Sequence, residues 1–229
     1  MEVLHVFVLI FAGFMGSFAQ EDLQNQVFVF PVESDSAAVV LKATIPHPLT
    51  SFTVCLWHYT FLNREITFFS YATPTTDNDI ILFKPKPNQY TVYVGNALTT
   101  FILPEQQHGK PAWEHLCASW ESSTGLVSLW VNGKLLPRAG LQKGYSISNE
   151  ASIVLGQDQD SILGGYEAKE SFVGEMREVS MWDRVLTPAE VCLAFSGCNL
   201  SDYLINWRAL SYEIQGYVVV QPYFTSCPR

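Results

Sequence analysis

The distribution of short β-forming runs and turn residues narrows the possible folds of this chain more than any other feature. Runs rich in Val, Ile, Phe, Tyr and Thr alternate with Pro, Gly and Asn. They cover residues 27–30, 39–41, 52–57, 66–71, 80–83, 90–94, 126–131, 152–155 and 217–220. Asn132-Gly133 after one of these runs predicts a two-residue hairpin turn. Because no helical segments separate the runs, we expect an all-β antiparallel sandwich of two sheets.

One segment instead carries the signals of a helix. Thr187 precedes Pro188, and Glu190 follows at the third helical position, which is a capping-box pattern. Apolar residues continue the segment until Gly197, a residue that commonly ends helices. We therefore expect one helix near residues 188–196. No Pro/Gly/Ser-rich linker divides the chain, so residues 20–229 are predicted to form a single domain.

The amino-terminal residues have the pattern of a secretory signal peptide. Residues 6–18 are apolar and uncharged, and a small-x-small cleavage pattern ends at Ala19. The alternative, a membrane anchor, requires about 20 apolar residues, and this run is shorter. We expect residues 1–19 to be removed and the mature protein to be secreted into the extracellular space, without a membrane span.

Composition and charge exclude two broad classes of protein. A hydrophobic content of 48% argues against a disordered chain. With 13 Lys+Arg against 22 Asp+Glu, the formal net charge is -9, which argues against nucleic-acid binding because phosphate contacts need basic side chains. The excess of acidic residues favours solvated loops or a hard cation such as calcium.

Two of the five cysteines lie in β-forming runs close to histidines. Cys55, His58, His115 and Cys117 could be imagined around a zinc ion. Strand alternation argues against that site, because Cys55 and His58 would point to opposite faces. His115, Cys117 and Ser119 would share one face. In a secreted protein we instead expect a disulfide between Cys55 and Cys117, joining the two sheets.

Residues 115–122 fit the pattern His-x-Cys-x-Ser/Thr-Trp-x-Ser/Thr and resemble the short pentraxin family. Similar segments recur at 27–31, 52–56, 69–73, 119–125, 151–161, 171–176, 181–186 and 206–218. The resemblance extends from about Val27 to Pro222. It implies a lectin-like jelly roll and a secreted pattern-recognition protein of innate immunity and the acute phase. Such proteins form homopentamers, bind calcium and are not enzymes.

The resemblance also assigns two calcium ions per subunit to two acidic segments. By composition alone these segments favour a solvated acidic loop, because they lack EF-hand spacing. One ion is assigned to Asp77, Asn78, Asp158, Asp160 and the backbone carbonyl of Gln159; the other is assigned to Asp158, Asp160, Glu167 and Glu170. The family usually has Glu at the position of Asp158 and often Gln at that of Glu170. We expect the added charge of Glu170 to offset partly the shorter reach of Asp158.

A small-ligand pocket is implied beside the calcium pair, lined by Ile81, Phe83 and Tyr93. Ordinary strand packing is the alternative interpretation of these three residues. Phe83 matches the ring that packs against choline methyl groups in some members, but Leu98 replaces the carboxylate that pairs with the choline ammonium. We expect binding of phosphoethanolamine, phosphocholine or anionic glycans, with weakened selectivity for phosphocholine.

Immune effector proteins are possible further partners. The resemblance aligns Asn132 and Phe195 with an Asp and a Tyr that help family members to engage complement. The changes remove a charge and a hydroxyl group, which argues against complement activation.

Three cysteines have no counterpart in the family. We expect Cys198 to pair with Cys227 and Cys192 to be buried or free, with an intermolecular bridge as the alternative. Asn199 begins an Asn-Leu-Ser glycosylation sequon.

Two other functional classes compete with recognition of head groups. One is a calcium-binding adhesive or structural module without a small ligand. The other is a glycan-cleaving enzyme on a jelly roll, which needs paired carboxylates across a cleft. Glu175 and Glu178 are three residues apart and would have opposite parity on a strand, so they fit surface charges better.

Overall fold

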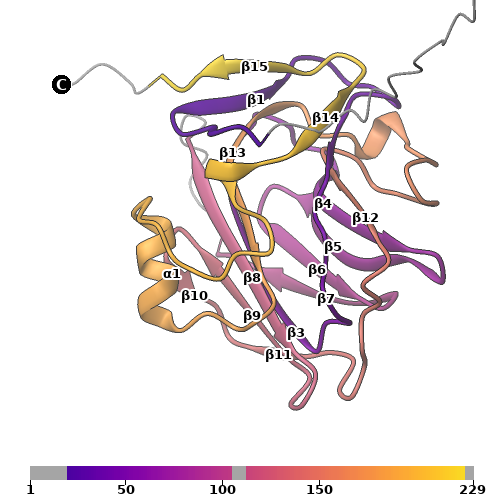
Figure 1. Ribbon diagram of the computed structural model, residues 1–229, viewed down its shortest axis with the longest axis vertical. Coiled ribbons are helices and arrows are strands. Elements are labelled where there is room, and N and C mark those ends of the chain that lie inside the picture. Colours follow the sequence, from indigo (N-terminus) through magenta and orange to yellow (C-terminus); the bar gives the residue numbers. More distant parts are fainter. Residues whose placement is uncertain (1–19, 105–111, 225–229) are drawn as a thin grey trace, which may run out of the picture.

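The computed structural model describes residues 20–104 and 112–224, which form two antiparallel β-sheets packed face to face (Figure 1). The predicted signal peptide lies outside the described residues. The arrangement confirms the predicted all-β jelly-roll sandwich, and neighbouring strands come from distant parts of the chain.

The first sheet has eight strands in the order β10-β9-β8-β3-β13-β1-β15, with β11 also paired to β9. Its strands are β1 (Gln26–Phe30), β3 (Ser51–Tyr59), β8 (Glu114–Glu121), β9 (Leu126–Val131), β10 (Lys134–Leu135), β11 (Ala139–Gly140), β13 (Gly174–Trp182) and β15 (Val219–Pro222). Asn132 and Gly133 join β9 to β10 with φ values of 49° and 73°. Positive φ at both residues is the requirement of a type I′ turn, so the predicted hairpin is confirmed.

The second sheet has seven strands in the order β14-β2-β12-β4-β5-β6-β7. Its strands are β2 (Ala38–Leu41), β4 (Ile66–Thr73), β5 (Thr76–Lys86), β6 (Gln89–Val94), β7 (Ala97–Ile102), β12 (Ser152–Leu155) and β14 (Tyr212–Gln215). The predicted runs omit β13, a central strand of the first sheet whose register shifts between Arg177 and Ser180, and they also omit β7 and β14 of the second sheet. The strands β7 and β14 are edge strands, and only Phe101 of β7 is buried, so neither has the apolar pattern of a central strand.

The core lies between the two sheets, and strand alternation determines which side chains enter it. On β8, Leu116, Ala118 and Trp120 face the core, whereas Cys117 belongs to a separate cluster on the outer face. The buried indole N–H of Trp120 donates to the carbonyl oxygen of Leu141 at 2.9 Å. The predicted alternation along β8 is therefore correct.

The predicted helix is α1 (Pro188–Phe195), which lies on the outer face of the eight-stranded sheet. Thr187 Oγ1 accepts a hydrogen bond from the backbone N–H of Glu190, whose carboxylate accepts one from the N–H of Thr187. Two short 3-10 turns are η1 (Ala168–Glu170) and η2 (Trp207–Ala209). In Figure 1, α1 is on the left and the β12–β13 connection is on the right. The helix and the acidic segment thus occupy opposite faces.

Candidate calcium site and ligand face

The connection between β12 and β13 crosses the outer face of the seven-stranded sheet. Tyr166 packs there over Ala38, Val40 and Val154, which point away from the main core. This connection carries most of the acidic residues that the resemblance assigned to calcium. It brings them to the same face as the start of β5.

Residues 157–160 alternate between buried amides and more accessible carboxylates. Gln157 and Gln159 are fully buried, Asp158 is partly exposed and Asp160 is exposed. The glutamines therefore anchor the segment, Asp160 faces solvent, and Asp158 lies between them with one buried carboxylate oxygen, Oδ1. The alternation leaves both carboxylates available for a cation.

The side chain of Gln159 is fully engaged by the protein. Its Oε1 accepts hydrogen bonds from Ser152 Oγ at 2.6 Å and from the backbone N–H of Leu163 at 2.9 Å. Its Nε2 donates to the backbone oxygen atoms of Ser70 and Ser152, each at 3.2 Å. The side-chain amide is thus unavailable to a metal, and only the backbone carbonyl group can take the role that the resemblance gives to this residue.

Asp158 occupies the most unfavourable electrostatic position in this segment. Burial, followed by the charges of Glu170 and Asp160, raises the pKa of its carboxyl group from 3.8 to about 7. Its Oδ1 atom is buried and has no hydrogen-bond partner among the described residues. A buried carboxylate oxygen without a partner is costly, and a bound cation would remove that cost. The donors around it fit a hard cation, because all are oxygen atoms.

The remaining acids of the segment also repel one another. Burial and the charges of Glu167 and Asp77 raise the pKa of Asp160. Burial and the charge of Glu65 raise the pKa of Glu170. Lys169 is the nearby counter-ion, with its Nζ 2.7 Å from Glu167 Oε2 and 3.9 Å from Glu170 Oε1. One exposed lysine leaves the cluster with an excess of negative charge.

Asp77 and Asn78, at the start of β5, complete the group. The charge of Asp77 contributes, after burial and nearer acids, to the raised pKa of both Asp158 and Asp160, so the three carboxylates interact electrostatically. Asp77 Oδ1 accepts a hydrogen bond from the N–H of Asn78 at 3.0 Å. The fold therefore brings all the assigned calcium ligands to one region, although they come from segments about 80 residues apart.

The sequence did not identify the residues that support this end of β5. Asp79 is buried, and its two carboxylate oxygens accept hydrogen bonds from Tyr145 OH at 2.7 Å and Thr73 Oγ1 at 2.8 Å. These bonds fix the backbone directly after Asn78. An acid within a β-forming run was the available signal for Asp79, but nothing local indicated Tyr145.

The three residues assigned to the ligand pocket lie together on the outer face of β5 and β6. Ile81 is directly opposite Tyr93, and the rings of Phe83 and Tyr93 are 6.4 Å apart in an edge-to-face arrangement. Burial and the charges of Asp158 and Glu170 raise the pKa of Tyr93, so the pocket adjoins the acidic group. Leu98 of β7 is paired with Tyr93 and is 51% exposed.

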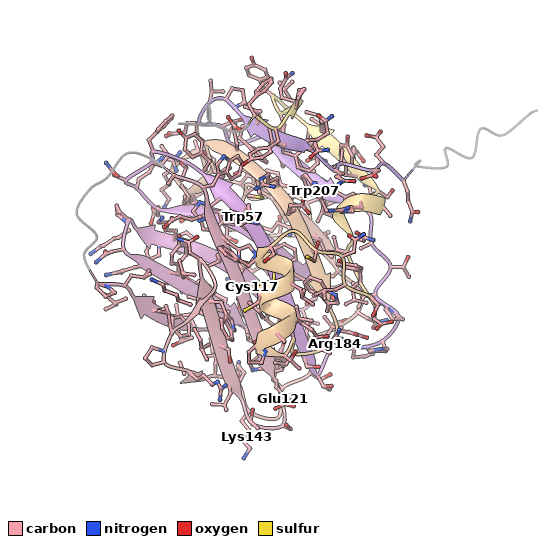
Figure 2. All side chains as sticks on the ribbon, turned by 90° about the vertical axis from the view of Figure 1, so that its left-hand side faces the viewer. Trp57, Cys117, Glu121, Lys143, Arg184 and Trp207 are labelled. Carbon is pink, nitrogen blue, oxygen red and sulfur yellow. A yellow bond between two sulfur atoms is a disulfide. The ribbon has the colours of Figure 1, made fainter. Side chains whose placement is uncertain are left out.

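The opposite face carries the disulfide between Cys55 and Cys117. The two residues are direct neighbours on β3 and β8, so the bond joins adjacent strands of one sheet; the expectation that it joins the two sheets is wrong. Sheet pairing brings the two cysteines together on the outer face, where α1 lies over the strand that carries Cys117 (Figure 2).

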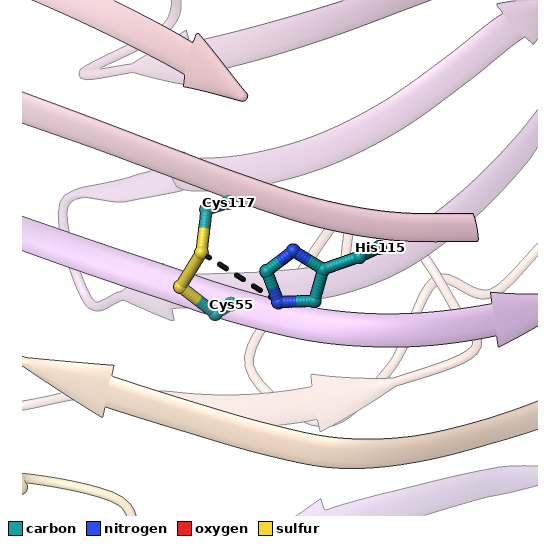
Figure 3. A group of neighbouring side chains, drawn as sticks. All are labelled: Cys55, His115 and Cys117. Atoms are coloured by element: carbon teal, nitrogen blue, oxygen red, sulfur yellow. Dashed lines mark hydrogen bonds between the residues drawn. A yellow bond between two sulfur atoms is a disulfide. The ribbon is translucent and has the colours of Figure 1, made fainter. Parts of the chain in front are cut away.

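His115 contacts this disulfide but does not form a metal site with it. Its Nε2 is 3.9 Å from Cys117 Sγ (Figure 3). Because the two sulfur atoms are bonded to each other, neither is a free thiolate for zinc. His58 lies on the core side, where its Nε2 is 3.1 Å from Tyr90 OH. Burial lowers the pKa of both histidines, that of His115 to about 4.

The other predicted sites also lie on the α1 side. Cys192 and Cys198 are exposed and form no disulfide with another cysteine among the described residues, so the alternative of a buried Cys192 is wrong. Cys227 is outside the described residues, and its pairing stays a prediction. Asn199 is exposed and lines a small cleft together with Cys198.

The two positions aligned with effector contacts serve local structure. Asn132 Oδ1 accepts a hydrogen bond from the N–H of His115 at 2.8 Å, and the ring of Phe195 stacks on Trp57 at 5.4 Å. In the part of the chain that the structure describes, no helix is long and apolar enough to cross a membrane.

Comparisons with known proteins agree with these observations. The model of the pentaxin family matches residues 26–222. The chain is 44% identical over 222 residues to C-reactive protein of Sus scrofa, covering 97% of this chain and 98% of that protein. It is 42% identical over 222 residues to serum amyloid P-component of Cavia porcellus, with the same coverage. The crystal structure of a native heptameric SAP-like pentraxin from Limulus polyphemus is similar, with a TM-score of 0.80 and 25% identity, covering 88% of this chain and 96% of that one.

Proposed function

The chain belongs to the pentaxin family, and from this we propose that it is a secreted, calcium-dependent recognition protein for phosphate-bearing head groups or anionic glycans on microbial or damaged-cell surfaces. The observation that carries the proposal is the unpartnered, buried Oδ1 of Asp158 within a group of mutually repelling carboxylates. Such a group is unfavourable without a cation and supplies the oxygen donors that calcium prefers.

The proposed ligands fall into two overlapping sets. Asp77, Asn78, Asp158, Asp160 and the backbone carbonyl of Gln159 would hold one ion; Asp158, Asp160, Glu167 and Glu170 would hold the other. Calcium ions bound there would neutralise the carboxylates and offer open coordination positions to an anionic oxygen of the ligand. An acidic protein could in this way bind an anion.

The apolar side chains beside the acids would determine which group attached to the phosphate is preferred. Phe83 and Tyr93 offer aromatic surface to a choline or ethanolamine group. Leu98 cannot provide a carboxylate partner for the ammonium. We therefore expect binding to depend mainly on the phosphate, with little preference for phosphocholine over phosphoethanolamine.

We further propose that the subunits form a closed ring. The similar Limulus polyphemus protein is heptameric, while the sequence resemblance predicts a pentamer. Ring assembly places equivalent sites in one molecule, so modest affinity at each site gives strong binding to a surface through avidity. Light scattering of the purified protein would give the number of subunits.

Secretion and glycosylation belong to the same proposal. Removal of residues 1–19 is expected during export, and an N-linked glycan at Asn199 is compatible with the exposure of that residue. Amino-terminal sequencing and enzymatic deglycosylation of protein from secreting cells test both expectations.

A binding panel tests the proposed function. The protein is applied to phosphoethanolamine, phosphocholine and agarose resins with calcium and again with chelator. We expect retention on the phosphate resins in calcium and release by chelator. If calcium binds but no resin retains the protein, the alternative of an adhesive or structural module is favoured. Release of sugars in a glycan screen would indicate the enzyme alternative.

A further inference from the structure

An exposed apolar tip lies within the acidic β12–β13 connection. Ser161 and Gly164 exchange two backbone hydrogen bonds, of 3.3 and 3.0 Å, which fold the chain into a tight turn. Ile162 and Leu163 form the end of this turn, and their exposed fractions are 48% and 41%. Two large aliphatic side chains thus project into solvent from the most acidic loop of the described chain.

The backbone at this tip is unfavourable for leucine. Leu163 has a φ of 56°, in the left-handed region where glycine and asparagine are preferred because a larger L-residue is strained there. The conformation is imposed by its surroundings. Gln159 Oε1 accepts the N–H of Leu163 at 2.9 Å, and Gly165 folds so closely against Asp160 that a Cβ atom would lie 2.6 Å from the Cβ of Asp160.

Strain and solvent exposure therefore coincide at one apolar residue. Neither the backbone strain nor the exposure of an apolar side chain stabilises the folded chain. An asparagine or glycine at position 163 would avoid the strain and would expose no apolar group. Imposed strain of this kind concentrates at functional positions, and exposed apolar groups mark contact surfaces. The tip is therefore a candidate contact surface.

The residues around the tip indicate which kind of partner surface the tip contacts. Asp160 precedes the turn and Glu167 follows it, and both belong to the proposed calcium site. The same face exposes Leu98 and Ile102 of β7, at 51% and 67%. A surface that presents phosphate groups directly above apolar chains matches this combination, and a phospholipid bilayer has that order of layers.

We propose that the Ile162–Leu163 tip inserts into the boundary between head groups and acyl chains when the neighbouring acids bind lipid phosphate through calcium. The inference rests on the proposed function. Two side chains are far too small an area for a stable protein interface of about 1,000 Å² or more, but they suffice for shallow insertion repeated around a ring. Without calcium, the flanking carboxylates would repel an anionic membrane surface and would be costly to bring into the head-group layer.

The test compares Leu163→Asn and Ile162→Ser with the unchanged protein. Asparagine accepts the left-handed backbone, so the first variant removes the apolar group without disturbing the turn. Leu193→Gln is the matched control, because Leu193 is 43% exposed on α1 at the opposite face. Calorimetry with soluble phosphocholine measures head-group binding, and co-sedimentation with phosphatidylcholine vesicles measures membrane binding, each with calcium and with chelator.

We expect both tip variants to bind soluble phosphocholine as the unchanged protein does, but to bind vesicles about tenfold more weakly or worse. The control should bind both normally. Ile162→Trp should show a blue-shifted emission on vesicles in calcium only.

The outcomes separate the tip from the head-group site. Equal vesicle binding by the tip variants, or no vesicle binding by a protein that binds soluble phosphocholine, overturns the insertion and leaves the proposed function standing. Failure to bind either ligand overturns the insertion and removes phosphocholine from the proposed ligands, and the resin panel then decides whether the proposed function stands. Loss of vesicle binding only in the tip variants, where vesicle binding does not depend on calcium, shows an apolar contact of the tip with membranes but overturns insertion coupled to lipid phosphate. A change of oligomeric mass in Leu163→Asn identifies the tip as a contact between copies and also overturns the insertion.

Discussion

At the residue scale, the carboxyl group of Asp158 couples the stability of the fold to its cation. Its pKa is raised to about 7 by burial and by neighbouring acids, whereas the same group in the unfolded chain has a pKa near 3.8. The folded protein without calcium therefore binds a proton that the unfolded chain has released. A cation held by the site would take the place of that proton.

The stability of the chelated protein is expected to depend on pH in a defined direction. A raised carboxyl pKa favours the folded state below about pH 4, and this contribution is lost as the pH rises towards 7. The loss has an upper limit of about 4 kcal/mol. Urea unfolding in chelator across this range should show it. Asp158→Asn should flatten the dependence, whereas Asp35→Asn, at an exposed position, should not. Equal slopes in all three proteins would contradict the assignment.

This chain has Asp158 where the family usually has Glu, and Glu170 where it often has Gln. Substituting each residue towards the family tests whether the two differences offset each other in calcium affinity. Asp158→Glu extends the carboxylate by one methylene and should strengthen calcium binding. Glu170→Gln removes a charge from the second ion and should weaken binding there. Calcium titration by calorimetry measures both changes, and the double variant shows whether they compensate. Unchanged affinity in both single variants would contradict compensation.

At the element scale, the β12–β13 connection is held by its buried glutamines, by Tyr166 and by Arg64, whose guanidinium group donates to the backbone oxygens of Lys169 at 2.8 Å and Ser171 at 2.7 Å. Burial is the largest cause of the raised pKa of Asp158, Asp160 and Glu170, and repulsion between the carboxylates raises each pKa further. The segment should therefore be ordered by calcium and loosened by its removal. The rigid sheet beneath it should not respond.

Limited proteolysis with trypsin is expected to detect this change. Lys169 has a side chain 63% exposed and lies within the connection. Cleavage after Lys169 should be rapid in chelator and slow in calcium. Cleavage after Arg138 or Lys143, which are exposed on other loops, is the internal control and should not depend on calcium. A calcium-independent rate at Lys169 would show that the segment is ordered by protein contacts alone.

At the scale of the whole molecule, we expect one face of the sandwich to contribute to stability and the other to ligand binding. The disulfide, α1 and the exposed cysteines lie on one face, and the acidic group with its apolar pocket lies on the other. Changes on the disulfide face should alter stability without altering ligand binding. Changes on the acidic face should alter calcium and ligand binding, and they should alter stability only through the carboxylates of the site.

Removal of the disulfide tests this separation. The bond spans 62 residues, and replacing Cys55 and Cys117 together by alanine should lower the free energy of unfolding by about 4 kcal/mol. Calcium-dependent retention on phosphoethanolamine resin should persist in the folded variant at low temperature. Loss of retention by a variant that is still folded, as shown by circular dichroism, would indicate that the two faces are coupled.

The predictions that succeeded from sequence rest on local physical chemistry. Most central strands, the Asn132-Gly133 hairpin and the capped helix follow from side-chain alternation, turn geometry and capping, whereas β13, which carries a register shift, was missed. Edge strands such as β7 and β14 were missed, because a strand paired on one side needs few buried residues. The calcium ligands required the family resemblance, since the composition of an acidic loop does not distinguish a metal site from a solvated surface.

The sequence by itself determined an acidic all-β domain, its helix and its Cys55–Cys117 pair. Only the tertiary structure decided that the disulfide joins neighbouring strands, that Tyr145 supports Asp79, and that Asp77 interacts electrostatically with acids far along the chain. The physical reason is the distance along the chain over which each interaction acts. Alternation, turns and caps act over a few residues, whereas strand order and electrostatic repulsion depend on which distant segments the packed sheets bring together.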